Sequence, residues 1–276
     1  MMFKQRTNLW NNFWIYLILF TLVLFFLLPM IWLVVAPFSS KASLAVKITL
    51  PSLNNFRELF KNKIAMLAFK NSFIISFSST VIVAITSMLA AYALSRTDFK
   101  WRSTLLYALL LFSTVVTGIA AMVPLFVLNL RLGLIDSYLS VIFVFIGGFL
   151  PVSIFIIKDF FDAIPKDYEE AAMVAGSTPS QGFFRIILPL SQQGMVVIAL
   201  YIFMNTWGSF LMPFILLRSV NKYPVSVAIY TFFTQEGLPL LGLLSAYSLL
   251  YSLPVIVLYI IINRKFGFGF HGGLKG

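Results

Sequence analysis

The side chains that could do acid–base or ionic chemistry are concentrated in one stretch, between Lys158 and Glu170. This stretch holds five of the nine acidic residues of the chain and only two bases, whereas the whole chain carries a formal charge of +11. Such an acidic island could serve catalysis, a cation or a basic surface on a partner. The remaining residue types decide between these uses.

Residue types that enzymes and metal sites need are scarce outside this stretch. The chain has no cysteine and one histidine, which excludes disulfides, thiolate metal sites and a histidine-based catalytic or zinc cluster. No stretch matches Gly-x-x-x-x-Gly-Lys-Ser/Thr, the loop that cradles nucleotide phosphates. We therefore expect no catalytic residue, no metal site and no cofactor on this chain.

The acidic stretch opens a segment that predicts two short helices joined by a turn. Pro165 suits the start of the first helix, whose first turns carry the acids that the helix dipole favours there. Gly176 suits a left-handed helix end. Thr178 and Gln181 have the spacing of a capping box for the second helix, which we expect to end by Pro189. On these local signals alone, an ordinary surface helical hairpin remains open.

The spacing of this segment carries more information than its composition. Glu-Ala-Ala, three residues, Gly, nine residues and Ile-x-Leu-Pro resembles the cytoplasmic loop signature of permease subunits in binding-protein-dependent ABC importers. In that family the loop forms a coupling helix that sits in a groove of the ATP-hydrolysing subunit. The resemblance therefore implies a docking surface for an ATPase subunit, with ATP and magnesium bound to that partner. The implied docking residues are Glu169 and the seven matching positions Glu170, Ala171, Ala172, Gly176, Ile186, Leu188 and Pro189.

The elements that position this loop are predicted from hydropathy. A hydrophobic fraction of 60% and a mean hydropathy of +0.96 lie well above the usage of soluble domains, which is roughly 45–50% apolar. Six windows without Asp, Glu, Lys or Arg are long enough to cross a bilayer. We expect an all-α membrane protein with six transmembrane helices and a coupling loop at 158–190 between spans 4 and 5. The expected spans are about 13–38, 71–95, 104–128, 138–157, 194–217 and 240–263.

We expect one transmembrane domain over 13–276, a cytoplasmic segment at 1–12 and a tail at 264–276. Charge decides the orientation only weakly, because placing the N-terminus inside leaves eleven bases inside and nine outside. The resemblance requires the signature loop to face the cytoplasm, and six spans then put both termini inside. The expected location is the cell membrane.

The resemblance extends from about Asn71 to the C-terminus and favours the carbohydrate branch, the maltose-type permeases. Two positions depart from that branch. Ala175 stands where many relatives carry an acidic residue, and Trp207-Gly208-Ser209-Phe210 stands where many carry Trp-Asn-Glu-Phe. The stretches that carry the resemblance are Asn71-Ser72, Ala90–Arg96, Pro124-Leu125-Phe126, Leu132–Ser137 and 272–276.

The charge-free windows weigh against a proton- or ion-coupled transporter, which usually needs ionisable groups inside the membrane. A neutral polar cargo needs hydrogen-bonding groups and aromatic faces along its path. Tyr201, Asn205 and Ser209 recur every four residues and so share one face of the fifth span, with Trp207 nearby. We interpret them as a candidate translocation path, and helix–helix packing stays open as the alternative.

Together these expectations describe a subunit that forms one half of a transmembrane pair. The partners implied by the resemblance are a second homologous permease, two ATP-binding subunits and an extracytoplasmic solute-binding protein that delivers a sugar or oligosaccharide; no nucleic acid is expected. Three alternatives stay open. The cargo could be another small solute, since phosphate, polyamine and metal importers share the loop signature, or the chain could be a stand-alone channel or facilitator, or a membrane scaffold without cargo.

Overall fold

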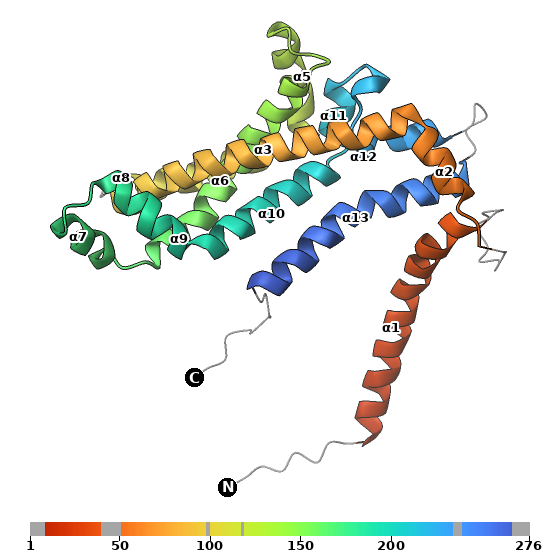
Figure 1. The fold of residues 1–276 in the computed structure, drawn as a ribbon, viewed down its shortest axis with the longest axis horizontal. Helices are drawn as coiled ribbons and strands as arrows, with labels where there is room; N and C mark the ends of the chain where they lie inside the picture. Colours follow the sequence, from red (N-terminus) through yellow and green to blue (C-terminus); the bar gives the residue numbers. More distant parts are fainter. Residues whose placement is uncertain (1–8, 40–50, 98–99, 117–118, 234–238, 267–276) are drawn as a thin grey trace. The chain divides into compact units, whose positions relative to one another are not determined.

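A computed structural model of the chain describes residues 9–39, 51–97, 100–116, 119–233 and 239–266. Within these residues the chain consists of helices and short connections, with two isolated β-bridges and no strand (Figure 1). The long helices are α1 (Leu9–Val35), α3 (Lys63–Arg96), α4 (Arg102–Val116), α6 (Tyr138–Asp162), α10 (Gln192–Gly208) and α13 (Leu241–Phe266). The shorter ones are η1 (Ala36–Phe38), α2 (Asn54–Lys61), η2 (Ile119–Ala121), α5 (Met122–Arg131), α7 (Asp167–Val174), α8 (Pro179–Gly182), η3 (Phe183–Ile187), α9 (Leu188–Leu190), α11 (Leu211–Leu216), η4 (Val220–Lys222), α12 (Val225–Ala228) and η5 (Ile229–Phe232).

Four helical segments of the described chain are long and apolar enough to cross a membrane: Phe13–Phe38, Lys63–Arg96, Tyr138–Asp162 and Leu241–Lys265. They correspond to the first, second, fourth and sixth predicted spans. The number rises to six if each of two bent helix pairs counts as one span. The expected all-helical membrane fold is therefore confirmed, with the third and fifth spans built differently from the rest.

Neither of these two spans is one straight helix. α4 and the segment that ends with α5 meet at 78°, across a break that includes 117–118, which lie outside the described residues. The helices before and within the fifth span meet at 75°. α10 itself ends at Gly208, because Ser209 is extended with a ψ of 127°, and the chain resumes as α11. The fifth predicted span, at about 194–217, therefore covers two helices, α10 and α11.

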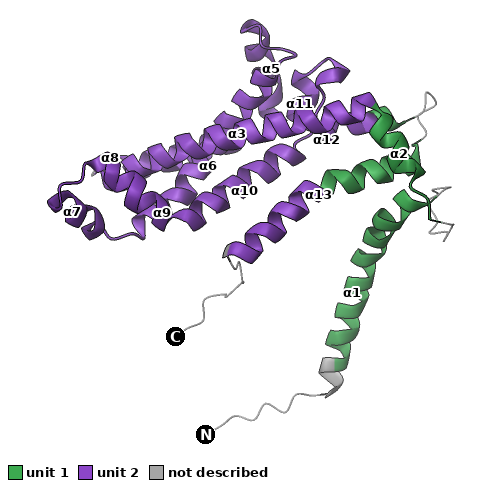
Figure 2. Cartoon of the chain, in the orientation of Figure 1, with its two compact units in different colours: residues 1–62, 231–252 green, residues 63–230, 253–276 purple. Residues whose placement is uncertain are grey.

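The chain divides into two compact units (Figure 2). Unit 1 comprises residues 1–62 and 231–252, and unit 2 comprises residues 63–230 and 253–276. Within unit 1, the Asn55 amide donates to the carbonyl oxygens of Pro37 and Ser39 at 2.9 and 3.0 Å, which ties α2 to η1 and the residue after it. Unit 2 contains the signature loop and the candidate path.

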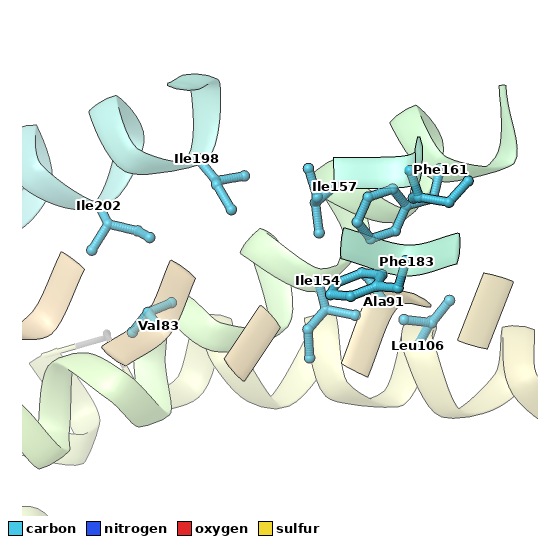
Figure 3. Packing of buried hydrophobic residues seen from close by; sticks show 10 residues of the cluster. Val83, Ala91, Leu106, Ile154, Ile157, Phe161, Phe183, Ile198 and Ile202 are labelled. Carbon is cyan, nitrogen blue, oxygen red and sulfur yellow. The ribbon is translucent and has the colours of Figure 1, made fainter. Parts of the chain in front are cut away.

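The centre of unit 2 is the contact of α3 with α6 and α10. The buried residues of α3 recur every three or four positions, and many of them are Ala or Ser. Small side chains on one stripe let membrane helices approach closely. A core cluster (Figure 3) joins these helices to α4 and to η3 of the signature loop, so the loop is packed directly on the helices. Its buried members are Val83, Ala91, Leu106, Ile154, Ile157, Phe161, Phe183, Ile187, Ile198 and Ile202.

Candidate functional site

The signature loop forms a helical hairpin, α7 followed by α8 to α9, at one end of unit 2 (Figure 1). α7 is followed by Gly176, whose φ of +88° lies in the left-handed region. The backbone N–H groups of Gly176 and Ser177 donate to the carbonyl oxygens of Met173 and Ala172 at 3.0 and 2.9 Å. This is a Schellman ending. The predicted left-handed glycine is confirmed.

The second half of the hairpin starts as predicted and ends within one residue of the predicted end. The hydroxyl of Thr178 accepts the N–H of Gln181, and the Gln181 side chain accepts the N–H of Thr178, so the capping box is confirmed. The helix ends at Leu190, one residue beyond the predicted end at Pro189, and passes through the π-helical η3 before α9.

The hairpin offers another molecule an exposed face. α7 carries exposed apolar side chains beside its acids: Tyr168, Met173 and Val174 are 56%, 48% and 91% exposed. Apolar surface on a helix with this many charges is typical of a protein-binding site. Of the signature residues, those exposed are Glu170, Ala171, Gly176 and Pro189, and those half-buried are Ala172, Ile186 and Leu188.

Glu169 differs from these seven residues because it is buried, 8% exposed, against the end of α3. Its carboxylate forms an ion pair with the guanidinium Nε of Arg96. Tyr92 donates its hydroxyl to the second carboxylate oxygen at 2.6 Å. The structure therefore places this carboxylate inside the chain and not on the exposed face that was expected to dock.

Sequence reasoning did not assign roles to Tyr92, Arg96 or Phe183. Tyr92 and Arg96 lie four residues apart at the end of α3, inside the Ala90–Arg96 run that resembles the family. That spacing puts both on one helix face and could have indicated a shared partner. Phe183 contacts the Tyr92 ring with 4.6 Å between centroids.

A second candidate site is a cavity of about 530 Å³ in unit 2. Tyr201, Asn205 and Ser209 all line it, so the structure brings the three predicted path residues together. The Asn205 amide donates to the carbonyl oxygen of Tyr201 at 2.7 Å, which leaves its own side-chain oxygen free to accept. Phe149 meets the Tyr201 ring edge to face at 5.8 Å. The other lining residues are Thr114, Val144, Phe145, Gly148, Val152, Met204, Gly208 and Met212.

Trp207 does not belong to this cavity. Its side chain is buried, 4% exposed, and stacks on Phe203 with 5.5 Å between ring centroids. Helical periodicity explains the difference, since Trp207 lies two residues from both Asn205 and Ser209 and so faces away from them. The structure thus places Trp207 in the packing of α10 rather than with the three lining residues.

At the other end of unit 2, Asp136 holds two segments together. Its carboxylate accepts the backbone N–H groups of Arg218 and Ser219, both at 2.9 Å, the Ser219 hydroxyl at 2.6 Å, and the Lys222 ammonium at 3.0 Å. Partial burial by itself raises the pKa of Asp136. The hydrogen bonds from Ser219, Arg218 and Lys222 outweigh it and hold that pKa well below its usual range.

Comparisons with known proteins give the same assignment as the loop signature. The chain is 35% identical to the inner membrane ABC transporter permease protein YcjP of Escherichia coli, over 75% of this chain and 74% of that protein. It is 31% identical to the trehalose transport system permease protein SugB of Mycobacterium tuberculosis, over 91% and 93% of the two chains. It is also 31% identical to the galactooligosaccharides transport system permease protein GanQ of Bacillus subtilis, over 95% and 94%.

Among solved structures, a bacterial ABC transporter involved in the import of the acidic polysaccharide alginate matches with a TM-score of 0.79. The match covers 96% of this chain and 100% of that chain at 20% identity, which shows a shared fold. No protein-family model matches the chain. On the identity and coverage of these relatives, the chain belongs to the family of ABC transporter permease proteins.

Proposed function

We propose that this chain is the permease subunit of an ATP-driven importer and forms half of the translocation pathway for a neutral sugar or oligosaccharide. The observation that carries the proposal is the hairpin of α7 to α9, which presents Glu170, Ala171 and Gly176 on an exposed face. That face combines acidic and apolar side chains, as a docking surface for a protein requires.

The proposed partners follow from what this chain lacks and from what its relatives are named for. A second homologous permease supplies the other half of the pathway. Two ATPase subunits bind ATP and magnesium, and one of them receives α7. A solute-binding protein delivers the cargo; a solved relative of this fold is a complex with a periplasmic protein that carries an alginate pentasaccharide. In this arrangement α7 and both chain termini lie in the cytoplasm.

The choice of a neutral cargo is supported by the cavity. None of its lining residues that the structure describes is charged, and three of them offer hydroxyl or amide groups, two on α10 and one on Ser209 directly after it. The aromatic ring of Tyr201 is half-buried beside these groups. Sugars are bound by hydrogen bonds from such groups and by contact with aromatic faces. The named relatives that transport trehalose and galactooligosaccharides support the same class of cargo.

In the proposed mechanism, closure of the ATPase pair on ATP moves α7, and the packed helices of unit 2 transmit the movement to the pathway. Tyr201, Asn205 and Ser209 orient the cargo by hydrogen bonds while access changes from outside to inside. This chain takes part in no bond-making step. Its contribution is to bind, to align and to move.

The test is reconstitution of the complete complex in proteoliposomes, with labelled oligosaccharide and the loaded binding protein outside. We expect uptake only when ATP and magnesium reach the ATPase subunits, and hydrolysis that rises with the loaded binding protein. Downhill movement of solute through this chain without ATP would instead identify a channel or facilitator. Efficient uptake of acidic but not neutral oligosaccharides would overturn the cargo class.

A further inference from the structure

Glu169 is the only buried residue of α7, all of whose residues are described, and it is charged. Every other side chain of this helix is exposed or half-buried. A surface helix is ordinarily held by an apolar stripe. α7 lacks such a stripe. Its attachment to the membrane helices therefore depends on the groups that pair with the Glu169 carboxylate.

Both partners of this carboxylate lie at the end of α3. Arg96 is the last residue of the helix, and its Nε pairs with one oxygen of Glu169. The Tyr92 hydroxyl, one turn earlier, donates to the other oxygen at 2.6 Å. The Arg96 and Glu169 side chains are 13% and 11% exposed, so water screens this pair little. Arg96 also donates to the carbonyl oxygen of Ile164 at 3.2 Å, which fixes the connection entering α7.

The same turn of α3 contacts the second half of the hairpin. The Tyr92 ring lies 4.6 Å from the Phe183 ring and 6.2 Å from the Phe161 ring, centroid to centroid. Apolar contacts of this kind let two surfaces slide over each other. The ion pair and the hydrogen bonds are directional, so α7 cannot shift along α3 without breaking them.

We infer that Tyr92, Arg96 and Glu169 form a clamp that carries displacement of the hairpin to α3, and that Glu169 is a positioning residue for coupling instead of a contact with the ATPase. This inference rests on the proposed function. α3 is continuous from the clamp to its N-terminal part, where the Asn71 amide donates to the carbonyl oxygen of Asn221 at 2.8 Å. A movement received at Arg96 therefore reaches the opposite side of unit 2.

The experiment measures solute taken up per ATP hydrolysed by the complete reconstituted complex. Glu169→Gln keeps the shape of the side chain and removes its charge, and Tyr92→Phe removes a single hydroxyl. Glu58→Gln is the matched control, because it makes the same chemical change at an exposed glutamate of α2, outside the hairpin. Each complex is first assayed for bound ATPase subunits and for hydrolysis without the binding protein.

We expect Glu169→Gln to retain its ATPase subunits and basal hydrolysis while uptake per ATP falls by roughly tenfold, with a smaller fall in the same direction for Tyr92→Phe and none for the control. Loss of the ATPase subunits from Glu169→Gln alone, with an unchanged ratio in Tyr92→Phe, would show that Glu169 is a docking contact and overturn the clamp. An unchanged ratio in both variants would overturn it as well. If Glu169→Gln fails to fold, the ratio in Tyr92→Phe decides. Failure of the proposed function is distinct, because wild-type uptake would then not depend on ATP.

Discussion

Two turns at different ends of unit 2 have the same backbone chemistry and different surroundings. Gly133 follows α5 with a φ of +67°, and Gly176 follows α7 with a φ of +88°. The N–H groups of Gly133 and Leu134 donate to the carbonyl oxygens of Leu130 and Asn129 at 3.1 and 2.9 Å, which repeats the Schellman pattern of α7. Local sequence therefore ends both helices in the same way.

The chain beyond each turn makes the difference. After Gly133, the Asp136 carboxylate accepts hydrogen bonds from Ser219 and Lys222 of a distant segment, so this turn is tied to another part of the same chain. After Gly176, Thr178 caps the next helix locally, and the face of α7 beside the turn remains exposed. A glycine at the end of a helix therefore indicates a left-handed turn and does not by itself indicate a function. Both glycines are exposed, so exposure does not distinguish the two turns. The chain after Gly133 is bonded to a distant segment of the protein, whereas the chain after Gly176 bonds only locally, and the second turn is the one in the loop signature.

The most direct test of the difference between the two turns is to strain the backbone of both equally. A Cβ at Gly133 or Gly176 meets no atom within 4 Å, and both positions have positive φ, so a β-branched residue strains the backbone at either one. The cost is about 1–2 kcal/mol at each. We expect Gly176→Val to lower binding-protein-stimulated hydrolysis and uptake by about tenfold or more, while Gly133→Val keeps both within about twofold. Uptake and ATPase assays on reconstituted complexes measure this.

The control for that pair is Gly182→Ala in α8. Gly182 has a helical φ of −57°, and its Cβ would also meet nothing within 4 Å. Near-normal activity is expected there. Equal loss of activity in the two valine variants would mean that the Gly176 turn has no special role in coupling.

The next largest effect is expected when a charge is added to the exposed surface beside each turn, and it concerns binding of the ATPase subunits. Val174→Lys places an ammonium on the most exposed apolar side chain of α7, and Leu132→Lys does so beside the other turn, where Leu132 is 61% exposed. We expect the first to weaken binding of the ATPase subunits by about tenfold and the second to leave it unchanged. Titration of purified ATPase onto the permease pair measures both. Equal affinity in the two variants would contradict the assignment of the docking face.

A substitution in the cavity tests contact with the cargo independently of the Gly133 and Gly176 turns. Asn205→Leu removes the polar group and keeps a similar volume, so we expect uptake to fall by about fivefold with assembly and basal hydrolysis retained. Labelled uptake and hydrolysis are assayed together. Wild-type uptake in this variant would show that Asn205 serves packing and does not contact cargo.

The smallest effect on transport is expected at Asp136, which follows the Gly133 turn. Asp136→Asn removes a charge that four donors satisfy, and we expect it to lower stability by about 1–3 kcal/mol with uptake near normal. The pKa of Asp136 is lowered on folding, so its stabilisation is full above the ordinary value of about 4 and is lost as pH falls through the lower folded value. Thermal unfolding should therefore separate the variant from wild type at neutral pH. A stability difference that grows in acid would contradict this account.

The sequence predicted the features whose causes are local. The left-handed Gly176, the capping box at Thr178 and the apolar long helices each depend on residues close together in the chain. The shared face of Tyr201 and Asn205 on α10 follows from periodicity, whereas Ser209 reaches the same cavity from extended backbone after the helix. That these residues line a cavity depends on α6, which packs on α10, and on α4, which packs on α6; no local pattern reveals this packing.

The missing predictions depend on contacts between distant residues or on irregular helices. Glu169 and Glu170 are neighbouring glutamates, yet only Glu169 meets Arg96, which lies 73 positions earlier. The π-helical turn before Pro189 and the extended Ser209 after α10 are features that the sequence analysis did not include. Neither irregularity has a strong signal in composition or spacing.

The central claim is that the face of α7 docks on an ATPase subunit, and proximity tests it most directly. The chain contains no cysteine, so Ala171→Cys and Leu132→Cys each supply a single exposed thiol, one beside each turn. Both are labelled with the same photo-crosslinker in membranes that contain the full complex. The account predicts a covalent product with the ATPase subunit from Ala171→Cys and none from Leu132→Cys. No product from Ala171→Cys, or equal products from both, would contradict it.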